Sequence, residues 1–515
     1  MKRFKKFFMV LALFACAISL FATGKAEKGD DESEFVTLTM YLVGDTVPDY
    51  GKMLDVLNER LKKDINAELD VKFTTWVDYQ TKLRLMLVSG EEIDLVHTAP
   101  WHIYNEQSQA GSFVALEDLA PIYAPKTWAG YSEAVLEQTR VNGHVYMLPF
   151  NFSEPLGQGI VYRKDLADKY GIGVVNSREK LMEYMIAVKA GEGMIPYNAG
   201  EFDLSVWPNQ CMEMQPSMPN IAVKRLMPIT GSDGIVPFVL YDDANKIYVE
   251  FETDAFMEAA EYTREMYQKG LIPRNVLSNT VGSREAFLAG QSAITTLNPL
   301  NANELYLKVS SSHPEWELDY WLPMDSNESF EKAPAINNGI SIPVASKHPE
   351  RALMLLELLH QDQFYNDLSS YGIRGEHWTV DANGDITAPE GLNLANSGFP
   401  WDQPCPWGWR EEKFYRLNVL KSSSAWSAVK KSQEAMSKIG VDQKWTGFSF
   451  DKSPVSTEIS ALNTVRSGVM TAMSWGVVDP KEGYAQLKDE FARAGLETVR
   501  AELKKQWSAY LATLK

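Results

Sequence analysis

VTLTMYLV (36–43), LDVKF (69–73) and IDLVH (93–97) are three short apolar segments, and their order along the chain decides the fold. In the first two segments, apolar side chains alternate with polar ones, which predicts strands with one buried face. The third is short and nearly continuous in its apolar character, and it predicts a further strand.

The sequence between these strands predicts helices. After the first strand, apolar side chains recur at helical spacing, at Met53, Leu54, Leu57 and Leu61. After the second strand, we expect Asp78 to cap a helix that runs through Leu87 and ends at Gly90. Strand–helix–strand–helix–strand predicts a parallel sheet with right-handed crossovers, and therefore an α/β domain.

A second α/β unit is expected from Gly159 onward, with a strand at 160–162 and a helix at 165–170. Before it, Asn142-Gly143 predicts a tight hairpin that leads into residues 145–150. The strand that joins the two units is a natural place for a hinge between domains.

The last third of the chain predicts mainly helices. Pro349 fits the first position of one helix, and Asp479 is expected to cap another that begins at Pro480. Residues 378–387 predict a hairpin that turns at Asn383-Gly384.

The chain has 515 residues and a formal net charge of −18. Such a length predicts two or three domains, because single hydrophobic cores rarely grow that large. A strong negative charge disfavours nucleic acid and anionic lipid surfaces as partners, since both would repel it.

The N-terminus predicts a targeting segment. A basic start and the apolar run from Phe7 indicate a signal peptide over residues 1–24, followed by a charged, flexible stalk over 25–35. Two processing routes remain open. Cys16 stands where a lipobox would place a lipid-anchored cysteine, or the segment is simply cleaved after Gly24 or Ala26. Both place the body outside the cytoplasm, in the periplasm or at the cell surface.

Few cysteines remain beyond that segment. Cys211 and Cys405 either form a disulfide in an oxidising compartment or stay unpaired and buried.

Motifs for nucleotide binding and for catalysis are absent from the sequence, including the Walker loop, GxGxxG, GxSxG, HExxH and paired CxxC. His97 and His102 are five residues apart, which does not suit one helix face, so no metal site is predicted. The series Asp381, Asn383 and Asp385 begins like a calcium loop, but Ile386 and Leu392 stand where that loop needs Gly and Glu. We therefore expect no cofactor and no catalytic residue.

Aromatic content is the chemical feature that remains, with 14 Trp, 22 Tyr and 22 Phe. Flat rings pack on the C–H faces of sugars, while carboxylates and amides bind their hydroxyls. WDQPCPWGWR (401–410) has this composition in a segment that cannot be regular helix. Trp101 follows the third strand, where open α/β sheets bind ligands, and it either caps the sheet or contacts a ligand.

Four motifs spread in order along the chain carry a family resemblance. They are YRKDL (162–166) with YGI (170–172), FLAGQSAI (287–294), SIPVASKHPERA (341–352) and YGIRGEHW (371–378). The chain resembles the extracellular solute-binding proteins of ABC importers, family 1, near the LplA-like lipoprotein branch. Arg163 departs from the family pattern, which has Asn at this position.

The resemblance implies an α/β, two-lobed, type II periplasmic-binding-protein-like fold with parallel-sheet lobes and a helical C-terminal extension. The N-lobe would comprise residues 36–150 and 299–338, and the C-lobe 151–298 and 339–515. Crossings between lobes would lie near 148–152, 295–298 and 337–339.

The same resemblance implies a ligand site between the lobes. The implied residues are Trp101, His102, Asn151, Glu154, Asn298 and Asn301, with Trp401, Trp407 and Trp409 as further candidates. Trp101 would stack on a sugar, Asn151 would exchange hydrogen bonds with hydroxyls, and Glu154 would accept them.

The implied function is capture of a carbohydrate, most simply an oligosaccharide, by a monomer that delivers it to the permease subunits of an ABC transporter. Three alternatives remain open: an extracytoplasmic carbohydrate-active enzyme, a binding protein for peptides or amino acids, and a sensor that presents its ligand to a receptor. A carboxylate ligand would need a cation in the site, for which Arg163 and Arg410 are candidates.

Overall fold

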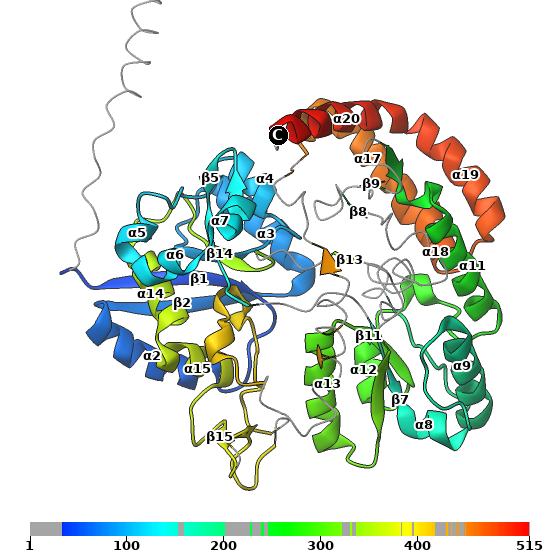
Figure 1. The fold of residues 1–515 in the computed structure, drawn as a ribbon, viewed down its shortest axis with the longest axis horizontal. Coiled ribbons are helices and arrows are strands. Elements are labelled where there is room, and N and C mark those ends of the chain that lie inside the picture. The colour runs from blue at the N-terminus through cyan, green and yellow to red at the C-terminus, as the bar shows by residue number, and fades with distance from the viewer. Residues whose placement is uncertain are drawn as a thin grey trace, which may run out of the picture.

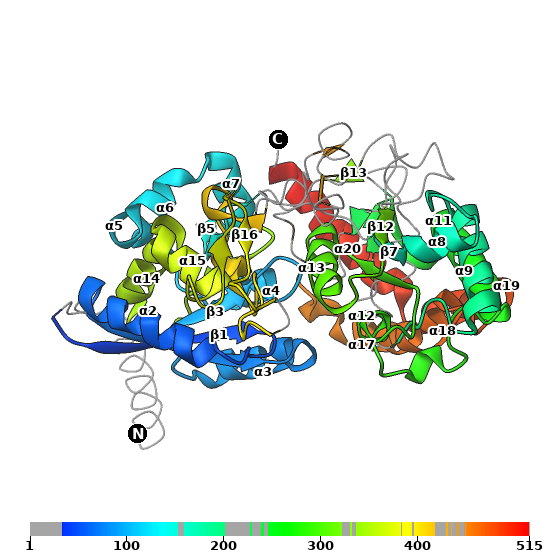
Figure 2. The same cartoon turned by 90° about the horizontal axis from the view of Figure 1, so that it is seen from below.

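The computed structural model describes residues 33–152, 159–200, 246–321, 336–382, 384–393, 396–417 and 450–513, with short pieces at 227–228, 238–240, 330–331, 429–430, 434, 440–441 and 448. These residues form two lobes that lie side by side (Figures 1 and 2). Each lobe has its own sheet and its own buried core.

The first lobe is built on a five-stranded sheet in the spatial order β2-β1-β3-β14-β6. Its strands are β1 (Val36–Val43), β2 (Ala67–Thr74), β3 (Leu95–Thr98), β6 (Met147–Pro149) and β14 (Gly339–Ser341). Strand β1 pairs in parallel with both β2 and β3, as the sequence predicts. Alternation along β1 buries Leu38 and Met40 completely, because every second side chain points into the core.

Four helices share a core with this sheet, namely α2 (Tyr50–Asp64), α3 (Trp76–Ser89), α14 (Pro349–Gln361) and α15 (Gln363–Tyr371). The start of α3 differs from the prediction. Its N-cap is Thr75, whose side chain accepts the N–H of Asp78, so Asp78 lies inside the first turn. Gly90 ends the helix with φ +69°, as predicted, since glycine adopts this conformation without strain. Pro349 occupies the first position of α14, also as predicted.

The second lobe contains a three-stranded sheet in the order β11-β7-β12, with β7 (Gly159–Arg163) between β11 (Ile294–Leu297) and β12 (Leu318–Trp321). Both pairings are antiparallel, so the expectation of a parallel sheet is wrong for this lobe. Gly159 is required here, because a Cβ at this position would lie 2.2 Å from the ring of Tyr320.

Helices α8 (Lys164–Lys169), α9 (Arg178–Glu192), α11 (Asp254–Gln268), α12 (Ser283–Leu288) and α13 (Pro299–Ser312) accompany the second sheet. The helical C-terminal extension is present as α17 (Ser456–Val465), α18 (Thr471–Ser474), α19 (Pro480–Arg493) and α20 (Leu496–Thr513). It shares a core with α11, and α20 runs from the outer edge of the second lobe back toward the first lobe (Figure 1). Asp479 caps α19 through the N–H groups of Lys481 and Glu482, which confirms its predicted start.

The division of the chain between the lobes corrects the predicted domain bounds. Helix α13 and strand β12 were expected in the first lobe, but β12 pairs with β7 of the second. Residues 339–371 were expected in the second lobe, but β14 pairs with β3 and β6, and α14 and α15 pack on the first sheet. The chain therefore returns to the first lobe between residues 321 and 339, and not near 295–298.

Both predicted hairpins are confirmed. Strands β4 (Arg140–Val141) and β5 (His144–Val145) pair around Asn142 and Gly143, whose φ angles are +53° and +88°. Strands β15 (Thr379–Val380) and β16 (Ile386–Thr387) form the second hairpin, and Asn383 of its predicted turn lies outside the described residues. Among the described helices, none combines the length and apolar character that crossing a bilayer requires.

Candidate functional site

The carboxyl end of β3 carries a cluster of rings that centres on His97. The ring centroid of His97 lies 5.2 Å from that of His102, 6.0 Å from Trp101 and 6.1 Å from Trp407. His97 and His102 are buried, whereas Trp101 and Trp407 are half-buried. We call these four residues the aromatic platform. Two of them, Trp101 and Trp407, offer partly exposed ring surface.

Hydrogen bonds fix the platform to the segment just before β14. Trp101 Nε1 donates to the carbonyl of Asn337 at 2.7 Å, and His97 Nε2 lies 3.1 Å from Oδ1 of Asn338. Residues 337 and 338 end the passage of the chain from the second lobe to the first. The platform is therefore anchored where that passage ends.

The two histidines form a chain of hydrogen bonds in which His102 donates to His97 and His97 donates to Asn338. When Nε2 of His97 donates to Asn338, Nδ1 of His97 must accept, and Nε2 of His102 lies 3.3 Å from it. Burial lowers the pKa of His97 to about 4 and lowers the pKa of His102 well below its usual value. Both rings are therefore neutral at neutral pH.

The segment 401–410 brings Trp407 to the platform from a distant part of the chain. Its indole N–H donates to the carbonyl of Asp402 at 3.3 Å, and its ring meets that of His97 at 85°. The three tryptophans of this segment therefore differ in role.

Trp401 and Trp409 are 4% exposed and belong to hydrophobic cores. Trp401 Nε1 donates to the carbonyl of His377 at 3.3 Å, and Trp409 Nε1 donates to Oγ of Ser369 at 2.9 Å. Both indole N–H groups are thus satisfied inside the core. The structure supports a ligand-binding role for neither ring.

Asn151 lies two residues after β6, where the chain leaves the first lobe. Its backbone N–H donates to the carbonyl of Arg410, and its side-chain Nδ2 donates to Oε2 of Glu411 at 3.1 Å. Glu411 in turn bonds the buried His360 at 2.8 Å. Asn151 is exposed, so its amide oxygen is accessible to solvent. Glu154, its predicted neighbour in the site, lies outside the described residues.

Asn298 and Asn301 stand at the start of α13. Oδ1 of Asn298 accepts the backbone N–H of Asn301 at 2.8 Å, so Asn298 acts as the N-cap of the helix. This structural role accounts for Asn298. The half-buried side chain of Asn301 lies one turn into α13.

A charged network around the buried Glu304 was not predicted from the sequence. Glu304 of α13 pairs with Arg284 at 3.0 Å and with Lys308 at 2.6 Å. Burial alone would raise the pKa of Glu304, but these two cations outweigh it and hold the pKa below its ordinary value. Gln403 Nε2 lies 3.4 Å from Oε2 of Glu304 and so links the 401–410 segment to α13 across the lobes.

Both arginines considered for a carboxylate ligand are already paired. Arg410 bonds Asp402 at 2.5 Å, and Arg163 bonds Asp165 through two N–H groups at 2.7 and 2.5 Å. Burial raises the pKa of Asp402 despite the nearby charge of Arg410. Neither guanidinium therefore offers a free ion-pairing face in this arrangement.

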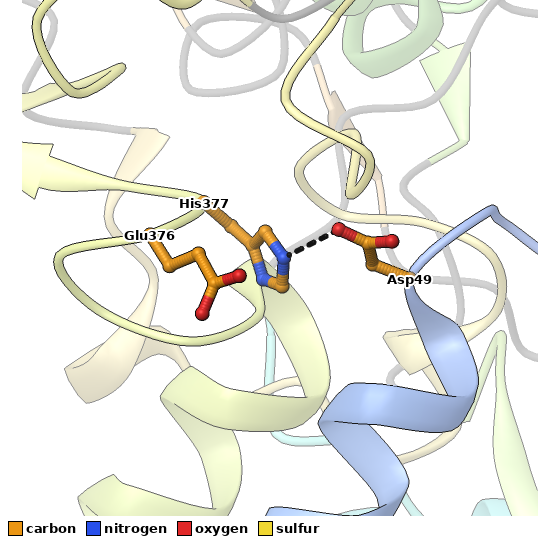
Figure 3. Close-up of side chains that lie close together, drawn as sticks. All are labelled: Asp49, Glu376 and His377. Atoms are coloured by element: carbon orange, nitrogen blue, oxygen red, sulfur yellow. Dashed lines mark hydrogen bonds and ion pairs between the residues drawn. The ribbon is translucent and has the colours of Figure 1, made fainter.

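Asp49, Glu376 and His377 form a group that could in principle hold a metal ion (Figure 3). The hydrogen bonds argue against it. Nδ1 of His377 accepts the N–H of Ile373 at 2.9 Å, so Nε2 carries the proton and donates to Asp49 at 3.2 Å. A metal at Nε2 would need the opposite tautomer. Lys52 also pairs with Glu376. The group is better explained as a structural link between α2 and the end of α15.

Cys405 is buried, and burial raises the pKa of its thiol well above the usual value. Cys211, its possible partner, lies outside the described residues, as does Cys16.

Comparisons with known proteins agree with this architecture. A protein of Streptococcus pneumoniae serotype 4 (strain ATCC BAA-334 / TIGR4), named carbohydrate ABC transporter substrate-binding protein, is 23% identical over 530 residues, covering 100% of both chains. A family model described as a domain of unknown function, DUF3502, matches residues 444–512.

Solved structures give the same picture. The N-glycan transport solute binding protein NgtS from Streptococcus pneumoniae matches with a TM-score of 0.73 and 21% identity, over 94% of this chain and 100% of NgtS. The alginate-binding protein AlgQ2 matches with a TM-score of 0.66 and 16% identity, over 92% and 98% of the two chains. These likenesses confirm the predicted type II solute-binding-protein fold and the predicted resemblance to solute-binding proteins of ABC importers.

Proposed function

We propose that this protein is an extracytoplasmic solute-binding protein that captures an oligosaccharide between its lobes and delivers it to the permease subunits of an ABC transporter. The name of the 23%-identical relative supports a carbohydrate ligand. So do the complexes of NgtS with Man1GlcNAc and Man5GlcNAc.

The observation that carries the proposal is the aromatic platform. Trp101 and Trp407 come from segments some three hundred residues apart, yet both rings approach His97 at the carboxyl end of β3. Stacking on partly exposed indole faces suits the C–H surfaces of a sugar ring. Ligands of open α/β sheets bind at this end of the strands.

In this proposal the platform supplies stacking, and polar side chains supply hydrogen bonds. Asn151 and Asn301 serve as amide partners for hydroxyls, and Glu154 as an acceptor. Within the platform, His102 holds His97 in place, because its ring is buried and bonded to His97. Trp401, Trp409 and Asn298 hold the surrounding structure in place.

The proposal extends to the N-terminus and to the partners. Residues 1–24 act as a signal peptide, and Cys16 is the site of lipid anchoring if processing follows the lipobox route. Intact-mass measurement of the processed protein separates a lipid-modified N-terminus from simple cleavage. The protein works as a monomer that docks on the permease.

Thermal unfolding against a panel of mono- and oligosaccharides, amino acids and short peptides tests the proposed function. A ligand that binds only the folded state raises stability by about 2.7 kcal/mol at a hundredfold excess over its dissociation constant. We expect a saccharide to raise the melting temperature and to be recovered chemically unchanged. A shift with peptides alone would refute the carbohydrate assignment, and a cleaved saccharide would identify an enzyme.

A further inference from the structure

Three charged side chains meet where the C-terminal region touches the first lobe. Nε and Nη2 of Arg84 in α3 each lie 3.1 Å from an oxygen of Glu106 in α4 (Tyr104–Gln109). Lys452, just before α17, brings its Nζ within 3.3 Å of the same carboxylate. Glu106 is thus shared between a cation of its own lobe and a cation of the other.

This cluster is partly shielded from water. The side chains of Arg84, Glu106 and Lys452 are 30%, 26% and 26% exposed. Burial alone would raise the pKa of Glu106, but hydrogen bonding from Arg84 and the charge of Lys452 outweigh it and lower the pKa. Glu106 is therefore ionised at neutral pH, and its attraction to Lys452 is less screened than that of a fully exposed pair.

The backbone around Lys452 is held firmly by its own lobe. The N–H of Asp451 donates to Oε1 of Gln506 in α20 at 2.8 Å, and Nε2 of Gln506 donates back to the carbonyl of Asp451 at 3.0 Å. Oδ1 of Asp451 also accepts the N–H of Ser453 at 2.9 Å. Because the base of Lys452 is fixed to α20, a displacement of the lobes must change its distance to Glu106.

The other end of the contact adjoins the aromatic platform. Glu106 lies four residues after His102 and five after Trp101, on the segment that follows β3. Burial is the main cause of the low pKa of His102, and the charges of His97 and Arg84 add to it. The ionic cluster and the platform are therefore electrostatic neighbours on one lobe.

We propose that the C-terminal region of residues 444–512, whose function is unknown, acts through Lys452 as an ionic latch on Glu106 that favours the lobe arrangement seen here. This inference rests on the proposed function, since it concerns the opening and closing of a binding protein. A latch of this kind sets ligand affinity by shifting the population of lobe arrangements, without touching the ligand.

Lys452→Met tests the latch, because methionine keeps much of the aliphatic stem and removes the charge. Lys504→Met is the matched control, as Lys504 is an exposed lysine of α20 in the same region. Spin labels at Ile122→Cys and Val174→Cys report the distance between the lobes, since these exposed positions lie on the first and second lobe. The background carries Cys211→Ser and lacks residues 1–24, while Cys405 stays protected by its burial.

Pulsed electron–electron distance measurements on the ligand-free protein give the populations directly. We expect Lys452→Met to change the ratio of lobe arrangements about fivefold, the effect of a partly shielded ion pair. Glu106→Gln should do the same, and the double variant should add little to either single variant. Lys504→Met should reproduce the parent distribution.

Raising the salt concentration provides a second test, because it weakens the Lys452–Glu106 ion pair in the parent protein without a substitution. In 1 M NaCl the parent distribution should move toward that of Lys452→Met in low salt, while the variant itself stays unchanged. Identical distributions for parent and Lys452→Met, with no response to salt, would overturn the latch. That result would leave the proposed function standing, whereas failure of every saccharide to bind would refute the function without any change in these distances.

Discussion

The platform tryptophans, Trp101 and Trp407, are half-buried, whereas Trp401 and Trp409 are buried in the core. Three of these four residues belong to the same segment, 401–410, yet their surroundings differ. Trp401 and Trp409 are 4% exposed, and their N–H groups bond inside the core. Trp101 and Trp407 bond backbone carbonyls at one edge and leave ring surface partly open. The comparison teaches that a cluster of aromatic residues combines structural and ligand-facing members, and that burial and hydrogen bonding separate them.

The largest effect on stability is expected from the buried Trp409. Trp409→Ala removes a large buried side chain and a hydrogen bond to Ser369, so we expect the free energy of unfolding to fall by about 3–5 kcal/mol. Chemical denaturation measures it. Trp128→Ala in α6 (Pro125–Gly130) is the control, since Trp128 is only partly buried in the same core. Equal losses in both variants would remove the distinction between core and partly exposed rings.

Acid should act on the platform through its buried histidines. The pKa of His97 is about 4 in the folded protein and near 6.5 when unfolded, so between these values only the unfolded state gains a proton. The free energy of unfolding therefore decreases as pH falls from about 6.5 to about 4, by about 3 kcal/mol from this residue.

His97→Gln should flatten the pH dependence in that window. Denaturation curves at pH 4.5, 5.5, 6.5 and 7.5 measure the slope. A slope in His97→Gln equal to that of the parent would show that His97 is not held neutral by burial.

Replacing Trp407 of the platform should affect saccharide binding more than stability. Trp407 is only partly buried against the core of the first lobe, so Trp407→Ala removes a stacking face and less core packing than Trp409→Ala. We expect saccharide affinity to fall about 30-fold, or about 2 kcal/mol. Isothermal titration of the saccharide found in the thermal panel measures it. The Trp128→Ala variant should bind as the parent does. Unchanged affinity in Trp407→Ala would place the ligand elsewhere.

The smallest effect is expected at the Asp49–Glu376–His377 group, which lies outside both regions. Glu376→Gln breaks a surface pair with Lys52 whose side chains are 40% and 53% exposed, so stability should change by less than about 1 kcal/mol. Zinc or EDTA should leave the melting temperature unchanged. A clear rise of melting temperature with zinc, lost in Glu376→Gln, would contradict the tautomer argument and identify a metal site.

Local signals in the sequence predicted much of the fold. Alternation placed β1 and β2, Asn142-Gly143 placed the hairpin of β4 and β5, and Asp479 placed the start of α19. Each depends on neighbours within a few residues. The lobe to which a helix or strand belongs depends on contacts between residues far apart in the sequence. The sequence therefore assigned β12, β14 and α13 to the wrong lobes.

The site was predicted in the same uneven way. Position after a strand identified Trp101, and composition identified the 401–410 segment, but neither could rank its three tryptophans. The network around Glu304 escaped prediction, because Arg284, Glu304 and Lys308 look like ordinary surface charges in sequence. Only the fold buries Glu304 beside the two partly exposed cations and Gln403. The contact between Glu106 and Lys452 likewise could not be predicted, since 346 positions separate the two residues.

The proposal that the aromatic platform binds an oligosaccharide is best tested by titration calorimetry. The parent protein is compared with the double variant Trp101→Ala/Trp407→Ala, first with Man5GlcNAc and then with the rest of the saccharide panel. We expect saturable binding of one saccharide per parent chain, with the sugar recovered intact, and loss of that binding in a double variant that still unfolds cooperatively. Equal binding by parent and double variant, or the absence of binding to every saccharide tested, would contradict the proposal.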